Sequence, residues 1–345
     1  MAADIATLPE PLADVAPPRG HHGAVAWGLW LARRLGLAVL TLWLVSILVF
    51  VATAALGDPV RAILGKDFTA NKARANELNA LLHADQPLVE RYLHWLGGIL
   101  TGDPGISLAS QQPVSELIGP TVVNSVVLVL ISALVMIPVA FGVAMVSANY
   151  RRRRPDTAIQ TVLLGLAGIP EFVIGILLVA VFSTTVLHWF PAVTISSSSG
   201  HPWDEPRSMV LPVATLVLAV SPYVSRIVRA TLLEVLDSDY VELARLKGVP
   251  ERVVMRKHAL LNAVVPVIQV IALQLAWLAG GVVLVEAVFN YPGMGKQLVD
   301  SVNAHDVPMV QALAMIIAAI YVGVNLVADL LSILLTPRAR TAISS

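Results

Sequence analysis

The residues that could take part in chemistry are three acids, Glu171, Glu286 and Asp329, each inside a long apolar segment. A charged group is costly in such surroundings, so each carboxyl should have a specific partner or a function. We expect Asp329, near the end of its segment, to pair with basic residues there. Glu286 either reaches water or forms an orienting hydrogen bond with the turn that follows, and we favour the hydrogen bond. Glu171 lies deepest, between Pro170 and Phe172, and either lines a polar path or makes a structural hydrogen bond.

Other reactive patterns are absent from the sequence. The chain has no cysteine, which excludes disulfides, thiolate metal sites and a cysteine nucleophile. Gly293, Gly295 and Lys296 have part of the spacing of a nucleotide-binding loop, but Asn290 and Gln297 stand where that pattern needs Gly and Ser or Thr. We therefore expect no catalytic residue, cofactor or metal in this chain, and any nucleotide must bind to another chain.

The segment that contains Asn290, Pro292, Gly293 and Gly295 is better explained as a reverse turn. Pro and Gly favour turns, and glycine also lets backbones pack closely. The less favoured alternative is that this segment contacts a substrate directly, at the outer end of the apolar segments.

Six apolar stretches are long enough to form the elements that carry these residues. Hydrophobic residues make up 57% of the chain and charged residues 13%, against about 45–50% and about 25% in soluble proteins. A bilayer core needs about 20 helical residues. The stretches are 35–56, 121–148, 157–187, 209–225, 263–288 and 309–335. We predict an all-α, polytopic membrane protein with six transmembrane helices.

Lys and Arg are distributed unevenly around these segments. Sixteen of them lie in the tails and loops on the side of the N-terminus, whereas the short loops on the other side hold only Arg207 and Lys296. The positive-inside rule therefore places both termini in the cytoplasm. Residues 1–30 are predicted to be a disordered cytoplasmic tail and residues 57–120 an extracytoplasmic cap, with helices at 73–82 and 87–100 and Gly102 as a stop. A cleavable signal peptide is the alternative for the first segment, but its apolar run exceeds the usual length of roughly 7–15 residues.

The cytoplasmic loop at 231–262 is not apolar enough to span a membrane, and its pattern is not that of a disordered segment. Asp239 and Glu242 are spaced as a variant capping box and predict a short helix. Gly248 has the position of a left-handed helix terminator, and Pro250 that of the first turn of a second helix. We expect two short helices that meet at a glycine; an ordinary amphipathic hairpin at the membrane surface is the structural alternative.

This loop resembles the EAA loop of binding-protein-dependent ABC importer permeases, whose pattern is Glu-Ala-Ala, three residues, Gly. Glu242, Ala244 and Gly248 match the pattern, whereas Leu243 replaces the middle Ala and Leu261 stands where a proline is expected. Other strings are similar, in the same order, to the dipeptide, oligopeptide and nickel permease group. They lie at 33–35, 57–59, 102–107, 170–172, 289–295 and 325–329. The likeness covers residues 31–340 or so.

The resemblance implies a permease domain at 31–340 in a prokaryotic plasma (inner) membrane, forming half of the path for dipeptides or oligopeptides. The loop would couple to ATP hydrolysis through Glu242, Ala244, Gly248, Pro250 and His258. The implied partners are a related second permease, two cytoplasmic ATP-binding subunits that hold ATP and Mg, an extracytoplasmic substrate-binding protein, a peptide substrate and membrane lipid. Since 23 basic residues balance 23 acidic ones, nucleic acid is not an expected partner.

Three other functions stay open on the sequence alone. The first is a permease of the same family for nickel chelates or another small solute. The second is a self-contained secondary transporter, which should show an inverted repeat that we do not find. The third is an intramembrane enzyme, for which the usual nucleophile and metal motifs are missing.

Overall fold

The computed structural model describes residues 22–55, 60, 64, 72–81, 86–194, 201–250, 253–255 and 261–335. These residues are mostly helical, and the β contact among them is an isolated bridge between Ile106 and Pro113. The long helices are α1 (His22–Ala55), α5 (Val114–Asn149), α8 (Pro206–Leu236), α11 (Leu261–Val288) and α13 (Val307–Leu335). The predicted all-α class is confirmed.

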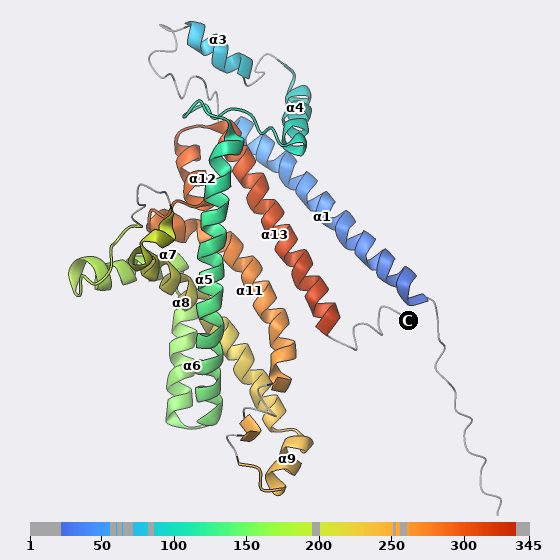
Figure 1. The fold of residues 1–345 in the computed structure, drawn as a ribbon, viewed down its shortest axis with the longest axis vertical. Helices are drawn as coiled ribbons and strands as arrows, with labels where there is room; N and C mark the ends of the chain where they lie inside the picture. The colour runs from blue at the N-terminus through green and yellow to red at the C-terminus, as the bar shows by residue number, and fades with distance from the viewer. Residues whose placement is uncertain are drawn as a thin grey trace, which may run out of the picture.

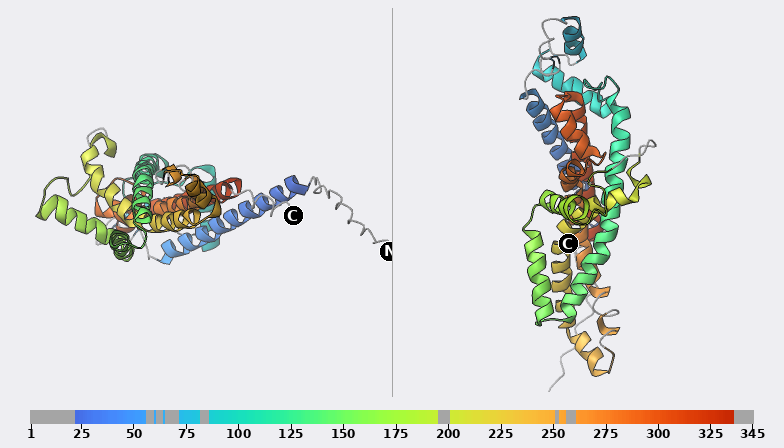
Figure 2. Two further views of the ribbon diagram at one scale, coloured as in Figure 1. Left: turned by 90° about the horizontal axis from the view of Figure 1, so that it is seen from below. Right: turned by 90° about the vertical axis from the view of Figure 1, so that its left-hand side faces the viewer.

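Shorter helices cap the two ends of the bundle (Figures 1 and 2). One end carries α3 (Lys72–Leu81), α4 (Leu88–Thr101) and α12 (Met294–Asn303), and the opposite end carries α9 (Asp239–Leu246). The bounds of α3 and α4 lie within one residue of the predicted helices. Gly102 ends α4 in the left-handed conformation, with a φ of 83°, as expected of a stop.

α8 lies at the centre of the packing. It contacts α5, α6 (Arg154–Ala167), α7 (Glu171–Val179) and α11. Its fully buried side chains include Leu216, Val220, Val224, Val228 and Leu232. Because these residues recur every four positions, they form one continuous apolar face.

α1 stands apart from this core. It slants away from the bundle in Figure 1, and it contacts chiefly α13, with α4 packed near its end. Most of the side chains described on α1, such as Leu37, Val39 and Leu48, are exposed. A helix with apolar residues all round and few protein neighbours is suited to lipid or to another membrane subunit.

Among the described residues, four or five helical stretches are long and apolar enough to cross a membrane. Four of the described helices qualify alone, at 27–55, 114–149, 206–236 and 307–331, and the pair formed by 154–167 and 171–185 qualifies as one bent span. α11 has 28 residues and coincides with the fifth predicted segment, but it is not among these. The six predicted spans therefore remain a prediction.

The third predicted span is not one straight helix. α6 and the stretch formed by α7 and the π-helical turn η2 (Ala180–Thr185) meet at an angle of 103°. α6 ends at Gly168, and Pro170 forms the N-cap of α7. A proline cannot donate the backbone hydrogen bond that would continue α6, and its ring disfavours a helical residue before it. The apolar segment predicted at 157–187 is therefore a span bent next to Pro170.

Candidate functional site

The turn after α11 is organised around the buried carboxylate of Glu286. This side chain is fully buried. Its Oε2 accepts hydrogen bonds from the backbone N–H of Gly295 (2.6 Å) and of Lys296 (3.3 Å), and its Oε1 accepts one from Ser125 Oγ (2.5 Å). The expected hydrogen bond to the turn is therefore present, and the alternative in which Glu286 reaches water was wrong.

Two glycines let this turn lie directly against α11. A Cβ atom on Gly293 would stand 2.1 Å from Glu286 Oε1, and one on Gly295 would stand 2.3 Å from the Cα of Val283. Asn290 has a left-handed backbone, with a φ of 50°. The predicted reverse turn with close backbone packing is confirmed.

α5 holds the other side of the same turn. Asn124 Nδ2 donates to the carbonyl of Pro292 (2.8 Å), and Tyr291 Oη donates to the carbonyl of Asn124 (2.8 Å). Ser125 Oγ accepts a hydrogen bond from the N–H of Met294 (2.8 Å) while donating to Glu286. Sequence reasoning missed both α5 residues, because a single Asn-Ser pair in an apolar segment carries no specific signal.

The other two acids lie in different surroundings. Asp329 on α13 forms an ion pair with Arg34 on α1, which agrees with the expected pairing to a basic residue near the segment end. Glu171 is part-exposed in the first turn of α7, between the exposed side chains of Pro170 and Phe172. Among the described residues, the Glu171 carboxyl makes no hydrogen bond or ion pair. Its role on a polar path stays a prediction.

α9 and the turn after it form the described part of the predicted coupling loop. Gly248 has a φ of 77°, and the N–H of Val249 donates to the carbonyl of Ala244 (3.2 Å), so the left-handed terminator is confirmed. The N–H groups of Val253 and Val254 donate to the carbonyl of Pro250, as expected where a helix begins. His258 lies outside the described residues.

The prediction of a capping box at the start of α9 was wrong. Ser238, not Asp239, is the N-cap residue, and no side chain caps the helix. The Ser238 hydroxyl instead donates to the carbonyl of Val235, at the end of α8. This bond directs the cap side chain toward the preceding helix. The Glu242 side chain is exposed to solvent.

The apolar residues of α9 divide between two sides. Val241 and Ala244 are buried against the bundle, whereas Tyr240, Leu243 and Leu246 are 45%, 52% and 79% exposed. Residues three apart in a helix lie close to one another on its surface. The free side of α9 is therefore an apolar stripe, which we call the α9 stripe.

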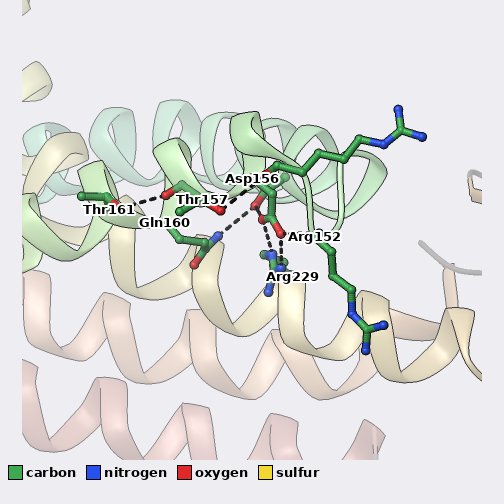
Figure 3. A network of polar contacts seen from close by, with 8 residues as sticks. Arg152, Asp156, Thr157, Gln160, Thr161 and Arg229 are labelled. Atoms are coloured by element: carbon green, nitrogen blue, oxygen red, sulfur yellow. Dashed lines mark hydrogen bonds and ion pairs between the residues drawn. The ribbon is translucent and has the colours of Figure 1, made fainter.

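A buried ion pair between α6 and α8 was not predicted from the sequence (Figure 3). Arg229 donates from Nε to Asp156 Oδ1 (2.9 Å) and from Nη2 to Asp156 Oδ2 (2.6 Å). The same carboxylate accepts from Ser147 Oγ (2.6 Å) and from the N–H of Arg152 (3.1 Å). Asp156 thereby joins the end of α5, the turn before α6, and α8. The two partners are 73 residues apart, so only the tertiary fold brings them together.

A second ion pair connects this corner to the start of α9. Arg151 Nη1 donates to Asp237 Oδ1 (2.6 Å), and Asp237 is the C-cap of α8. The hydrogen bond from Arg151 holds the pKa of the Asp237 carboxyl below its usual value. Arg245 on α9 donates to the carbonyl of Leu236 (3.2 Å). The α6 corner, the end of α8 and α9 are thus linked by polar contacts.

These features fit a membrane component of a transport system, and sequence comparison identifies its class. Residues 139–341 match the family described as "Binding-protein-dependent transport system inner membrane component". Residues 29–118 match the corresponding N-terminal family, described as "Binding-prot-dependent transport system membrane comp, N-term". The chain belongs to this family and is a permease subunit of a binding-protein-dependent ABC importer, a multi-pass component of the inner membrane.

Particular relatives extend the match to nearly the whole chain. The glutathione transport system permease protein GsiC of Escherichia coli (strain K12) is 36% identical over 309 residues, which cover 89% of this chain and 97% of that protein. The proteins of the same name from Shigella flexneri serotype 5b and Shigella dysenteriae serotype 1 have the same identity and coverage. Membership of the family implies an ATP-binding partner and a substrate-binding partner for this chain.

Proposed function

We propose that this chain forms half of the translocation path of an importer for small peptides and that α9 transmits ATP hydrolysis to it. The single observation that carries the coupling role is the α9 stripe, which stands free at one end of the bundle next to the left-handed turn at Gly248. The remaining half of the path would come from a related second permease, and a substrate-binding protein would deliver the peptide from outside.

The α9 stripe has the chemistry of a docking element. Three apolar side chains at helical spacing are unfavourable in water and fit an apolar groove on a partner. Family membership supplies the partner, an ATP-binding subunit. In this proposal two such subunits hold ATP and Mg, and the present chain has no catalytic residue of its own.

Polar contacts give α9 a physical connection to the membrane helices. The α8–α9 junction is held by the Arg151–Asp237 ion pair and by the hydrogen bond from Arg245 to the carbonyl of Leu236. About two turns earlier on α8, the Asp156–Arg229 ion pair joins α8 to α6. Because packed helices move as rigid units, a displacement of α9 would be passed on to α8. α8 lies at the centre of the bundle, so its movement would reach most of the other spans.

The orientation in the membrane follows from the charges. The positive-inside rule places the α9 end and both termini in the cytoplasm, and the end with α3 and α4 outside. This orientation puts α9 on the side where an ATP-binding subunit can reach it. The turn around Glu286 then lies toward the outer end of the path.

The substrate class rests on the relatives. Proteins named as glutathione permeases match over almost the entire chain, and glutathione is a tripeptide. Glu171 is the proposed polar contact on the path, since its part-exposed carboxyl lies at the bend between α6 and α7 with Phe172 beside it. Glu171→Gln should leave assembly and basal ATP hydrolysis intact and change the uptake of cationic relative to neutral peptides; an unchanged ratio removes Glu171 from the path.

Reconstitution with the co-encoded subunits tests the coupling role and the substrate. In proteoliposomes, ATP-driven uptake of a labelled tripeptide is measured for the wild type, for Leu246→Ser, and for Val302→Ser, a matched exposed control on α12 at the opposite end. Leu246→Ser should lower uptake and peptide-stimulated ATP hydrolysis severalfold at equal membrane abundance, and Val302→Ser should not. Full coupling in Leu246→Ser contradicts the docking role, and uptake of a nickel chelate without any uptake of peptide contradicts the substrate class.

A further inference from the structure

Two adjoining pockets lie where α1 ends and α13 begins, away from the coupling loop. The first, of about 530 Å³, is lined by α4, residues 103–106, Phe50 at the end of α1, and the first turns of α13. The second, of about 650 Å³, lies along the same α1, α4 and α13, with α5 as a further wall, and shares Pro104 with the first. Figure 1 shows α4 beside the end of α1 at this place.

The first pocket is lined by two α4 residues that each carry a hydrogen-bond donor without a partner. Arg91 and Trp95, one turn apart on α4, both line it. Arg91 Nε and Trp95 Nε1 are shielded from solvent and have no hydrogen-bond partner. A buried donor without an acceptor destabilises a protein, so an acceptor that binds here would remove that cost. An anionic oxygen group is the acceptor that suits a guanidinium and an indole N–H together.

The charges of the same pocket limit which anion fits. Asp103 is also in the lining, and its Oδ1 accepts the N–H of Gly105 (3.2 Å). A carboxylate in the same pocket as the guanidinium disfavours a free phosphate dianion, but it can pair with an ammonium group. The pocket is therefore complementary to a zwitterion with one negative and one positive group.

The second pocket has the opposite character. Its walls are mainly apolar and include Leu42, Leu96, Leu100 and Ile316. Leu100 is 78% exposed and Leu93, on the wall of the polar pocket, is 60% exposed, so this side of α4 presents apolar surface to its surroundings. Aromatic residues gather at the same level, with Tyr92 and Trp95 packed on Phe50. Such residues are enriched where a membrane meets water.

We propose that the two pockets together bind one phospholipid with a zwitterionic amine headgroup, such as phosphatidylethanolamine. The phosphodiester would accept hydrogen bonds from Arg91 and Trp95, the ammonium would pair with Asp103, and an acyl chain would lie in the apolar pocket. A zwitterionic peptide satisfies the same charges, but it has no apolar tail for the adjoining pocket. The lipid is therefore the better match to the whole site.

The importer complex, purified in detergent and delipidated, provides the test. Native mass spectrometry measures the binding of phosphatidylethanolamine, phosphatidylglycerol, inorganic phosphate and the dipeptide Ala-Ala. Wild type should bind phosphatidylethanolamine best. Arg91→Gln should weaken that binding about tenfold or more, since it removes a charged donor, and Trp95→Phe should weaken it about fivefold. Asp103→Asn should remove the preference for phosphatidylethanolamine over phosphatidylglycerol.

A control variant and two opposing outcomes complete the design. Arg153→Gln, at an exposed arginine outside the site, should bind lipid as the wild type does. Thermal unfolding of each variant without lipid confirms that it is folded. Equal lipid binding by Arg91→Gln, Trp95→Phe and the wild type overturns the proposal. Binding of Ala-Ala or inorganic phosphate in preference to lipid also overturns it and assigns the polar pocket to a soluble solute.

Discussion

Breaking the Asp156–Arg229 pair should be costly in an asymmetric way. Asp156 keeps 7% of its side chain exposed and Arg229 keeps 21%. Removing one partner of a buried pair costs about 3–5 kcal/mol when the remaining charge stays buried. Arg229→Met leaves the Asp156 carboxylate buried with only Ser147 and the N–H of Arg152 as donors, so we expect a loss of about 3 kcal/mol. Asp156→Asn keeps the shape and leaves an arginine that can reach water, so its cost should be about 1–2 kcal/mol.

The double variant separates the pair from its surroundings. If the two side chains interact as the geometry indicates, Asp156→Asn combined with Arg229→Met should cost about 1–2 kcal/mol less than the two single changes added together. Unfolding by SDS in mixed micelles, followed by circular dichroism, measures all four proteins, with Arg153→Gln as an exposed arginine control. Additive losses, within about 0.5 kcal/mol, would refute the interaction. Equal losses in the two single variants would refute the burial argument.

Three further changes test the turn, the loop terminator and the α8–α9 junction. Gly295→Ala should destabilise the protein by about 1–3 kcal/mol in the same SDS unfolding assay, because the new Cβ would overlap the backbone of Val283; Gly142→Ala, where a Cβ meets nothing within 4 Å, is the control, and equal stability of the two contradicts the packing. Gly248→Val should reduce ATP-driven uptake at normal membrane abundance, since a β-branched residue resists a φ of 77°. Gly248→Asn should keep most of the uptake, because Asn tolerates the left-handed conformation. Equal uptake by the two variants would contradict the conformational explanation. The lowered pKa of Asp237 means that its pairing with Arg151 is complete above the usual carboxyl pKa and is lost as the pH falls through the lowered value. The hydrogen-exchange rate of α9, corrected for its intrinsic pH dependence, should therefore rise as the pH falls over that range. In Asp237→Asn the rate should already be raised at neutral pH.

Several local features could be predicted because their causes are local. Gly102 and Gly248 end helices, since glycine lacks a Cβ and adopts the left-handed conformation at no steric cost. α3 and α4 follow from apolar periodicity, and the turn that contains Gly293 and Gly295 follows from residue types that favour turns. The buried acid Glu286 was expected to bond to that turn because the turn follows it directly along the chain.

The amino-acid sequence by itself determined the class of this protein, because long apolar runs can be satisfied only in a membrane or a large core, and it determined the positions of glycine-dependent turns. Tertiary structure alone decided which polar groups meet. Asp156 pairs with Arg229 from 73 residues away, and Ser125 completes the bonds of Glu286 from 161 residues away. It also decided that the chain bends by 103° before Pro170, although prolines inside α8 leave that helix continuous. The physical reason is that a proline removes one hydrogen bond in either place, and the packing of neighbouring helices determines whether the helix then bends or continues.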